Sequence, residues 1–470
     1  MVALADYCSQ CDSEDWPRHI ILLLSSCPPA QLQSWLTPQC QPPIQRIYTI
    51  CPPDHVLRNQ LLAMLIYCGA IETWVELICN DPPTKIEGIE LAFVPLSSND
   101  SFSLTPEQLQ HLIENGTDNR TVAASIYELA NREFRESRVD SHPAAGRIQP
   151  LCELAGGLIN RLEMIEEGKL PEGATPESIA QTVQESVALI IALMDAMALL
   201  NHEPAKLKMK QALELKHRRL QVEAAAGLAR MSDEDGITRL IALAEQPVIR
   251  PRVIAYAKEL GIDDQISIEL KGSISNAESM LALWLSQQEQ MGLAPTSMKL
   301  LEQRELYWPS YEDPIDCFLF EFVYGTGDNA FQNIGISGPL THAFVSDISH
   351  LNHADQFSAF AGWQTLTDEI FLVAIEKAEK MLAGDLSRLW RRVDEQTYTD
   401  ATPIMMASFF GEFVLIADAT KNHEKGTLIV NNDHVDWIER GNEKAPIDWQ
   451  LAFDIWKGRK LLTNFNPAFS

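Results

Sequence analysis

Positive charge is scarce in this sequence. Its 470 residues include 37 lysines and arginines against 65 aspartates and glutamates, which gives a formal net charge of −28. Acidic residues are in excess in every third of the chain. Because a surface of that sign repels nucleic-acid phosphates and anionic lipid headgroups, we expect no nucleic-acid partner and no membrane partner.

The first residues lack the basic start and the long apolar run of a secretory signal. Segment 1–16 carries Asp6, Asp12, Glu14 and Asp15, and the apolar run at 20–24 is shorter than a signal core or a membrane span. We therefore expect a cytoplasmic protein. Its length and its apolar content of 46% are ample for several packed domains.

Cysteine is present but lacks the paired spacing of a metal site. Most of the nine cysteines lie among apolar residues, as Cys68, Cys152 and Cys317 do. A reduced thiol in such surroundings behaves as a small hydrophobic side chain. Cys8 and Cys11 form a single CxxC with no second pair at zinc-binding spacing. We expect no metal and no other cofactor, although metal binding by Cys8 and Cys11 stays open.

Apolar residues at helical spacing dominate the first 300 residues. Two start signals, Thr105-Pro106-Glu107-Gln108 and Thr175-Pro176-Glu177-Ser178, place a capping threonine before a proline at the first helical position. The run 190–200 is apolar on almost every side, which predicts a helix buried by its neighbours. We expect an all-helical region over 1–305 that includes helices at 277–291 and 295–303.

One stretch, residues 203–261, repeats itself with an offset of 31 residues. A second apolar helical run, 237–244, lies between the two copies. Repeats of roughly 20–50 residues are typical of arrays in which each unit buries its apolar face against the next. The matching positions are Arg219, Val222, Ala224, Ala226 and Ala229 in the first copy and Arg250, Val253, Ala255, Ala257 and Leu260 in the second.

The repeated unit resembles a HEAT-like repeat. The resemblance is carried by Arg219-Leu-Gln-Val222-Glu-Ala-Ala-Ala226-Gly-Leu228, the turn Ser232-Asp-Glu-Asp235-Gly and the helix Ile237-Thr-Arg-Leu240-Ile-Ala-Leu243. HEAT-like proteins in general are scaffolds and adaptors, so the resemblance implies an α-solenoid and a protein partner of unstated identity. HEAT-like bilin lyases are a further class that it admits, but no residue here points to a pigment-protein partner.

After residue 305 the apolar period falls from 3.6 to 2. A proline and aromatic joint, 306–314, leads into an alternating strand at 315–324, with which 331–336 should form an antiparallel hairpin. This order of elements predicts an α+β domain over 315–470. The further elements we expect are helices at 341–350, 355–362, 368–396 and 449–462 and strands at 409–419, 426–430 and 435–438.

The main basic cluster immediately precedes the clearest repeat. Lys206 and Lys210 are four residues apart and share a helix face. The simpler interpretation is the solvated rim of a solenoid, and the sharper one is a docking site for an acidic partner. The candidate residues are Lys206, Lys208, Lys210, Arg218 and Arg219. A second basic run, Lys457-Gly-Arg459-Lys460, should pair with the carboxylates of its own domain.

A glycine-rich turn is the second candidate site. We expect a strand that ends in glycines and a helix capped by Thr341, whose free N–H groups would bind an anion. The spacing matches neither a Walker loop nor a dinucleotide fingerprint, so a structural turn is the simpler interpretation. The residues of this candidate ligand loop are Gly335, Ser337, Gly338, Thr341 and His342.

Histidines and aspartates follow this turn at His342, Asp347, His350, His353 and Asp355. Such residues ligate zinc or transfer protons, but this spacing is not HExxH. Neither Cys317, in an aromatic strand, nor Ser337, in Gly-Ile-Ser-Gly, has the sequence context of a nucleophile. We therefore assign no catalytic residue and no metal ligand.

The sequence favours a protein-interaction scaffold, a HEAT-like solenoid followed by a smaller α+β domain. The rival hypothesis is an enzyme or small-ligand domain over 311–470, in which the loop Gly335–His342 forms the site and the solenoid presents a protein substrate.

Overall fold

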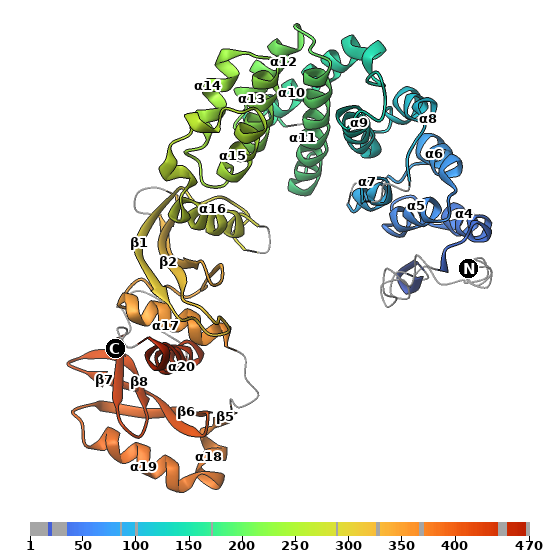
Figure 1. Ribbon diagram of the computed structural model, residues 1–470. Coiled ribbons are helices and arrows are strands. Elements are labelled where there is room, and N and C mark those ends of the chain that lie inside the picture. The colour runs from blue at the N-terminus through green and yellow to red at the C-terminus, as the bar shows by residue number, and fades with distance from the viewer. Residues whose placement is uncertain are drawn as a thin grey trace. The chain divides into compact units, whose positions relative to one another are not determined.

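The computed structural model describes residues 17–20, 35–84, 87–98, 102–170, 173–287, 290–325, 330–365, 371–439 and 449–466. The chain divides into two compact units (Figure 1). The helical unit comprises Met1–Leu243 with Ala255–Asp263, and the two-sheet unit comprises Ala244–Ile254 with Asp264–Ser470. The chain is thus a helical region followed by two antiparallel sheets, and Cys8 and Cys11 lie outside the described residues.

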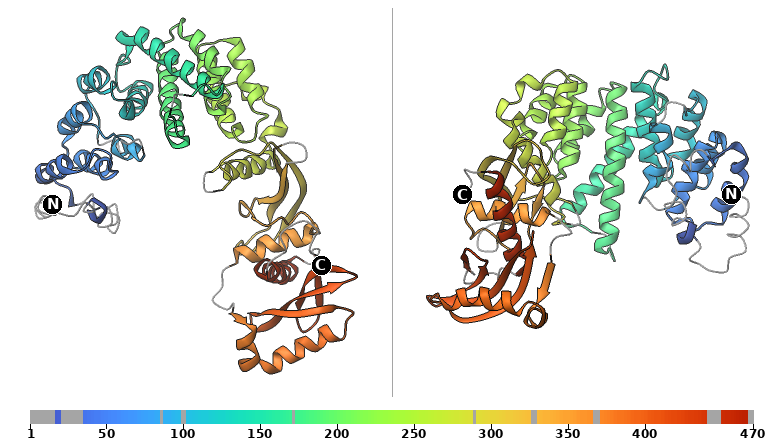
Figure 2. Two further views of the ribbon diagram at one scale, coloured as in Figure 1. Left: turned by 180° about the vertical axis from the view of Figure 1, so that it is seen from behind. Right: turned by 60° about the horizontal axis from the view of Figure 1, so that its bottom comes forward.

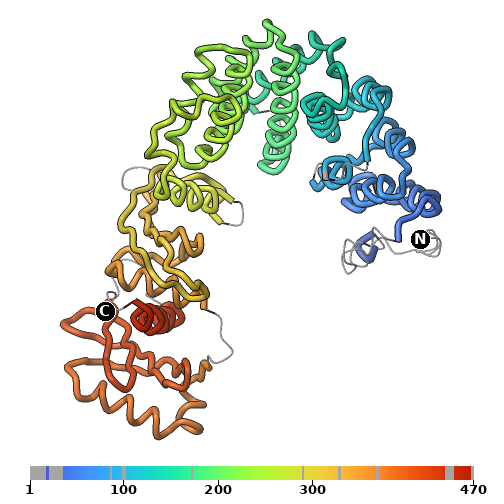
Figure 3. Tube along the Cα trace, in the orientation of Figure 1, coloured from blue at the N-terminus to red at the C-terminus, as the bar shows by residue number. Residues whose placement is uncertain are grey.

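The helical unit consists of helices joined by short turns (Figure 3). Its elements are η1 (Pro38–Cys40), α4 (Gln41–Ile50), α5 (Leu57–Tyr67), α6 (Ile71–Asn80), η2 (Ile89–Ala92), α7 (Val94–Ser98), α8 (Pro106–His111), the π-helical turn η3 (Leu112–Gly116), α9 (Arg120–Arg135), η4 (Ala145–Arg147), α10 (Ile148–Glu166), α11 (Pro176–Leu199), α12 (Ala205–Leu213), α13 (Arg218–Arg230) and α14 (Glu234–Leu243). Helix α15 (Arg250–Glu259) has residues in both units. Helices α13, α14 and α15 lie where the repeat predicts them.

Both predicted helix starts are confirmed. At α8 the Thr105 hydroxyl accepts a hydrogen bond from the Gln108 amide, and the Gln108 side chain accepts one from the Thr105 amide. Thr175 and Ser178 form the same reciprocal pair at α11. These bonds satisfy amides that have no partner inside the helix, which fixes where each helix begins.

Helix α11 is the apolar centre of the helical unit. It packs against α9, α10 and α13, and the Asn131 side chain donates a 2.9 Å hydrogen bond to the Ala192 carbonyl. Among the described residues it is the one helix long and apolar enough to cross a membrane, and 61% of that apolar window is buried inside the fold. The burial predicted for 190–200 is therefore confirmed, and α11 is placed as a core helix.

The two-sheet unit holds a four-stranded sheet ordered β1-β2-β3-β4 and a five-stranded sheet ordered β5-β6-β7-β8-β9, both antiparallel. Its elements are α16 (Ser273–Leu285), β1 (Ser297–Leu306), β2 (Ile315–Tyr324), β3 (Phe331–Ser337), β4 (His342–Ala343), α17 (His353–Gln364), β5 (Phe371–Ala374), α18 (Ile375–Met381), α19 (Ala383–Asp394), β6 (Thr399–Phe409), β7 (Glu412–Lys421), β8 (Glu424–Val430), β9 (Val435–Glu439) and α20 (Trp449–Phe465).

The two-sheet unit is layered (Figure 1). Helix α16 packs on the outer face of the first sheet through Leu281, against Phe318 and Phe320. The opposite faces of both sheets share one core with α17 and α20, which lie between them. Helices α18 and α19 cover the outer face of the second sheet. Each sheet is therefore buried on both faces by helices.

The two sheets are built alike. In the first, Leu306 of β1 pairs with Ile315 of β2, and in the second Phe409 of β6 pairs with Glu412 of β7. Counted from these pairs, both sheets carry a β-bulge at the same step, between Leu300 and Glu302 in β1 and between Pro403 and Met405 in β6. Bulges are defined positions rather than accidents, so this match is informative.

The correspondence continues across both sheets. Phe318 opposes Ser337 where Leu415 opposes Val430, and Ile336 opposes His342 where Ile429 opposes Asp436. Strands β1–β4 follow the outer helix α16 and precede the central helix α17, as β6–β9 follow α19 and precede α20. We call α16, β1–β4 and α17 the first half-domain and α19, β6–β9 and α20 the second half-domain (Figure 2).

Helices α17 and α20 cross at two glycines. A Cβ at Gly362 would overlap the Asp454 carbonyl oxygen, and a Cβ at Gly458 would overlap the Ser358 carbonyl oxygen. Gly362 follows Ser358 by one helical turn and Gly458 follows Asp454 by one turn, so the contact is reciprocal. This is the geometry of two equivalent elements related by a twofold axis, and it relates the half-domains.

The helix predicted at 295–303 is wrong, because these residues form most of β1. The bulge after Leu300 shifts the alternation, so that Met298 and Leu300 face α16 while Leu306 faces α17 and α20. A strand whose alternation changes phase lacks a clean period of 2. The joint predicted at 306–314 also belongs to the sheet region, since Trp308 is 1% exposed in the central core.

The helix predicted at 341–350 is also wrong. Residues 342–343 form β4, and the following segment is tied to β3 by the Asn333 side chain, which donates to the Phe344 carbonyl at 2.8 Å and accepts from the Ile348 amide. The long helix predicted at 368–396 is divided into β5, α18 and α19 over 371–394. The other predicted strands and the closing helix are confirmed, and the hairpin 315–336 pairs as expected.

Candidate functional site

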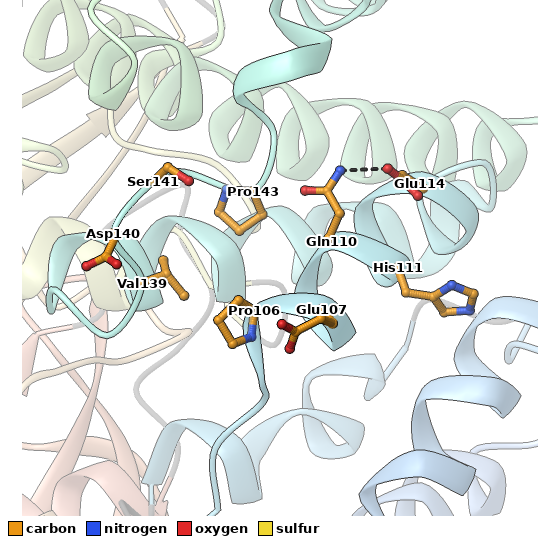
Figure 4. A pocket seen from close by; sticks show the side chains of 9 residues that line it. All are labelled: Pro106, Glu107, Gln110, His111, Glu114, Val139, Asp140, Ser141 and Pro143. Carbon is orange, nitrogen blue, oxygen red and sulfur yellow. Dashed lines mark hydrogen bonds between the residues drawn. The ribbon is translucent and has the colours of Figure 1, made fainter.

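A pocket of about 560 Å³ lies in the helical unit (Figure 4). One wall comes from α8 and η3 and the other from the turn between α9 and η4. The lining residues are Pro106, Glu107, Gln110, His111, Glu114, Val139, Asp140, Ser141 and Pro143. The lining therefore carries three carboxylates and no lysine or arginine.

The first wall is set by the start and the end of α8. The capping box at Thr105 begins the helix, so Glu107 lies in its first turn. At the other end the chain widens into the π-helical turn η3, which carries Glu114. Turns of this kind are rare and are frequent at functional sites. Gly116 ends the turn, where a Cβ would come within 2.7 Å of Ile126.

The second wall is held by a buried histidine. His142 is 2% exposed; its Nδ1 accepts a hydrogen bond from the Ala144 amide, so its Nε2 donates to Asn131 Oδ1 at 2.9 Å. Asn131 in turn donates to α11. Burial lowers the pKa of His142 to about 4, so the ring is neutral at pH 7. The turn that carries Asp140 and Ser141 is thereby fixed to the core of the unit.

The charge in the pocket is negative at neutral pH. Hydrogen bonds from its own backbone amide and from Thr105 lower the pKa of the Glu107 carboxyl. Glu114 accepts a 2.7 Å hydrogen bond from Gln110. The neighbouring Arg147 guanidinium donates to the Ile113 carbonyl at 2.5 Å and does not line the pocket. Such a hollow suits a cationic group, above all a lysine or arginine side chain.

The basic cluster predicted as a partner site is largely engaged within the molecule. Lys206 pairs with Glu203 at 2.9 Å, and Lys210 pairs with both Asp233 and Asp235. Lys208 lies over Gly156 and donates to Gln211. Arg218 and Arg219, at the start of α13, are exposed. Lys210 thus joins α12 to α14, the contacts of Lys206 and Lys208 include local ones, and the two arginines remain on the surface.

The glycine-rich turn leads into β4 and not into a helix. The free N–H groups of a helix N-terminus, which were the predicted anion donors, are therefore absent from this described segment. A Cβ at Gly335 would come within 2.8 Å of Leu281 on α16. Gly338 has a φ of +117° and lies against the Asp316 carbonyl. Ser337 is fully buried in β3, and its hydroxyl has no hydrogen-bond partner among the described residues. Gly335 therefore allows α16 to pack closely on β3, and Gly338 allows a tight turn.

His342 lies among aromatic rings. It stacks on Trp363 with ring centroids 3.8 Å apart, and it meets Trp284, Phe344 and Phe360 edge on. Desolvation lowers the pKa of His342 to about 4. The ring is therefore a neutral packing group at pH 7 rather than an acid or base.

The other histidines and aspartates of this segment do not converge on one point. His353 Nδ1 lies 2.6 Å from Glu302, and Asp355 binds Arg459 through two hydrogen bonds. Within the described ranges no group of three or more His, Cys, Asp or Glu side chains is arranged to hold a metal ion. Cys317 is fully buried, and desolvation raises the pKa of its thiol to about 12.

The carboxy-terminal basic run pairs with its own domain, as predicted. Arg459 bridges Asp355 and Asp436, Lys457 pairs with Asp454, and Lys460 pairs with Glu412. The pocket itself was not predicted. Its local signal was the acidic first turn of α8, but only the fold brings Asp140 to face Glu107.

Comparison with family models, with curated proteins and with solved structures finds no match to this chain. The function is therefore argued from the site alone.

Proposed function

We propose that this protein is a cytoplasmic interaction scaffold whose helical unit, a HEAT-like solenoid, binds a partner protein through a basic segment of that partner. The observation that carries the proposal is the pocket at 106–143, with three carboxylates and no lysine or arginine in its lining. Its position beside a π-helical turn supports the proposal. Neither a nucleic acid nor a lipid surface suits it, because both are anionic.

The repeat supports the solenoid. Helices α13, α14 and α15 occupy the two copies of the 31-residue pattern. Arrays of stacked helix pairs present extended surfaces to partner proteins. The rival hypothesis, an enzyme or small-ligand domain over 311–470 with its site at the loop Gly335–His342, gains no support from the two glycines, because close packing explains both Gly335 and Gly338.

Glu107 has a matched control within the chain. Glu177 occupies the same position after the Thr175 cap, and the same two kinds of hydrogen bond lower the pKa of its carboxyl. Glu107 lines the pocket and Glu177 does not. Changing either residue to lysine removes the same favourable interaction with a helix N-terminus, so only binding should distinguish the two variants.

The test uses the full-length chain and a capped peptide with two arginines separated by one glycine, followed by calorimetry. We expect Glu107→Lys with Asp140→Lys to weaken binding by about tenfold or more, because both carboxylates face the cation. Glu177→Lys should bind as the wild type does. Equal affinities for all three proteins, or no binding to any, would overturn the proposal. Capture from the native cell with the same three baits then identifies the partner.

A further inference from the structure

The outer edge of β6 is occupied by β5, whereas no segment that the structure describes occupies the equivalent edge of β1. In the second half-domain, β5 pairs antiparallel with β6, with Phe371 opposite Ser408 and Ala374 opposite Met405. In the first half-domain, β1 is the edge strand of its sheet, and no described segment pairs with its other side. The register common to the two half-domains places 405–408 on 302–305.

The backbone of β1 at 302–305 resembles that of β6 at 405–408, where β5 pairs. The bulge in β1 does not disqualify it, because β6 carries a bulge at the same step and still pairs with β5 beyond it. Exposed side chains are compatible with an added strand as well, since Phe371 is 60% exposed and Leu372 is 44% exposed. Unpaired backbone groups at a sheet edge bind extended chains by main-chain hydrogen bonds.

The side chains at the open edge are polar and charged, whereas those at 405–408 of β6 are uncharged. Glu305 corresponds to Ser408, which faces Phe371 of β5, and Glu305 lies directly opposite Asp316 of β2. Both carboxylates are exposed, and neither forms an ion pair in the part of the chain that the structure describes. Gln303 donates one hydrogen bond to Asp316 at 3.1 Å. Like charges opposite one another destabilise a strand pair, so a cation between them would relieve the repulsion.

We propose that residues 302–305 of β1 bind an extended segment of a partner protein as an added antiparallel strand, with a lysine or arginine of that segment beside Glu305 and Asp316. The main-chain hydrogen bonds provide the affinity, and the basic residue determines which peptide sequences bind. Charged side chains at an exposed edge are also how native sheets limit association with a second copy of themselves. This surface is separate from the pocket at 106–143.

The test compares two capped hexapeptides added to the full-length chain. Ser-Lys-Leu-Val-Ala-Ser keeps Leu-Val-Ala of β5 and places lysine at the position of Phe371, and its twin carries glutamate instead of lysine. Hydrogen exchange read by mass spectrometry reports the amides of 302–305. We expect the lysine peptide to slow their exchange by about threefold or more, and the glutamate peptide to have no effect.

A charge reversal keeps the test independent of any loss of folding. In Glu305→Lys we expect the preference to reverse, so that the glutamate peptide now slows exchange at 302–305. The control Glu395→Lys changes the net charge equally at an exposed position after α19, and it should behave as the wild type. Equal protection by both peptides, protection that ignores Glu305→Lys, or no protection at 302–305 would overturn the inference. Slowed exchange confined to 106–143 would count against it too, because it would assign the peptide to the pocket.

Discussion

The two half-domains have the same arrangement of strands and helices, but the contact between the fourth strand and the central helix is aromatic in the first and ionic in the second. His342 on β4 corresponds to Asp436 on β9, because they pair with equivalent residues. Trp363 follows Gly362 on α17 as Arg459 follows Gly458 on α20. In the first half-domain the strand meets the helix through a stack of His342 on Trp363, and in the second through an ion pair of Asp436 and Arg459.

This difference shows which features are required for the shared arrangement of strands and helices. The register, the bulge and the glycine crossing are common to both halves, whereas the contact between the fourth strand and the central helix is not. A half-exposed contact of this kind is worth little more than about 1 kcal/mol in either chemistry. The close approach of α17 and α20 is therefore the feature whose loss should matter most.

The largest effect is expected at the helix crossing. Gly458→Ala and Gly362→Ala each place a methyl group against a backbone carbonyl that cannot move aside, and each should lower the free energy of unfolding by about 3 kcal/mol. Gly384→Ala is the control, because a Cβ at this helical glycine of α19 meets nothing within 4 Å. Denaturant unfolding measures all three. Equal midpoints for Gly458→Ala and Gly384→Ala would refute the close crossing.

A smaller loss of stability is expected when the ionic contact of Arg459 or the aromatic contact of Trp363 is removed. Arg459→Met leaves two carboxylates without their cation, Asp436 on β9 and Asp355 on α17, whose side chain is 12% exposed, and should cost about 2 kcal/mol. Trp363→Met removes a ring that is 43% exposed and should cost about 1 kcal/mol. Thermal unfolding ranks the two variants. A greater loss from Trp363→Met would mean that the aromatic stack contributes more to stability than the two ion pairs of Arg459 do.

Acid should weaken the first half-domain through His342. The pKa of His342 is about 4 in the folded protein and about 6.5 in the unfolded chain, so only the unfolded chain binds a proton between these values. The free energy of unfolding therefore falls as the pH drops from 6.5 towards 4. Between pH 7 and 4.5 the wild type should lose about 1 kcal/mol more than His342→Phe, after allowance for partial exposure. The contribution of His142 to the pH dependence is the same in both proteins, so it cancels in the comparison. Parallel pH curves would contradict this expectation.

The smallest effect tests whether the two contacts are interchangeable. His342→Asp and Trp363→Arg together place the pair of the second half-domain in the first. Each single change leaves one group without its partner, so the double variant should recover about 0.5 kcal/mol relative to the sum of the singles. A double-mutant cycle in denaturant measures this coupling energy. Strict additivity would mean that the half-domains differ in more than these two side chains.

The features predicted from the sequence are those set by local chemistry. The caps at Thr105 and Thr175, the alternating strand at 315–324 and the closing helix all follow from neighbouring residues. The strand β1 was missed because its bulge breaks the alternation. The segment after His342 was missed because it is held by the Asn333 side chain on β3, a contact that the helical pattern of the segment itself does not reveal.

The pocket and the duplication depend on residues that meet only in the fold. Asp140 reaches Glu107 because His142 is anchored through Asn131 to α11, which no local pattern reveals. The duplication is hidden because equivalent positions carry unrelated side chains, such as Trp363 and Arg459. Identical residues at equivalent positions are few, and they include Gly362 and Gly458 at the crossing, Phe357 and Phe453 on the same two helices, and Ile336 and Ile429 on β3 and β8.

The crossing of α17 and α20 also sets the order in which this chain becomes native during synthesis. Helix α17 completes its core only against α20, and the ribosome must first add the residues from 365 to 465. At roughly 5–20 residues per second this takes several seconds or more. Throughout that interval the apolar face of α17 lacks its native cover and is exposed in the nascent protein.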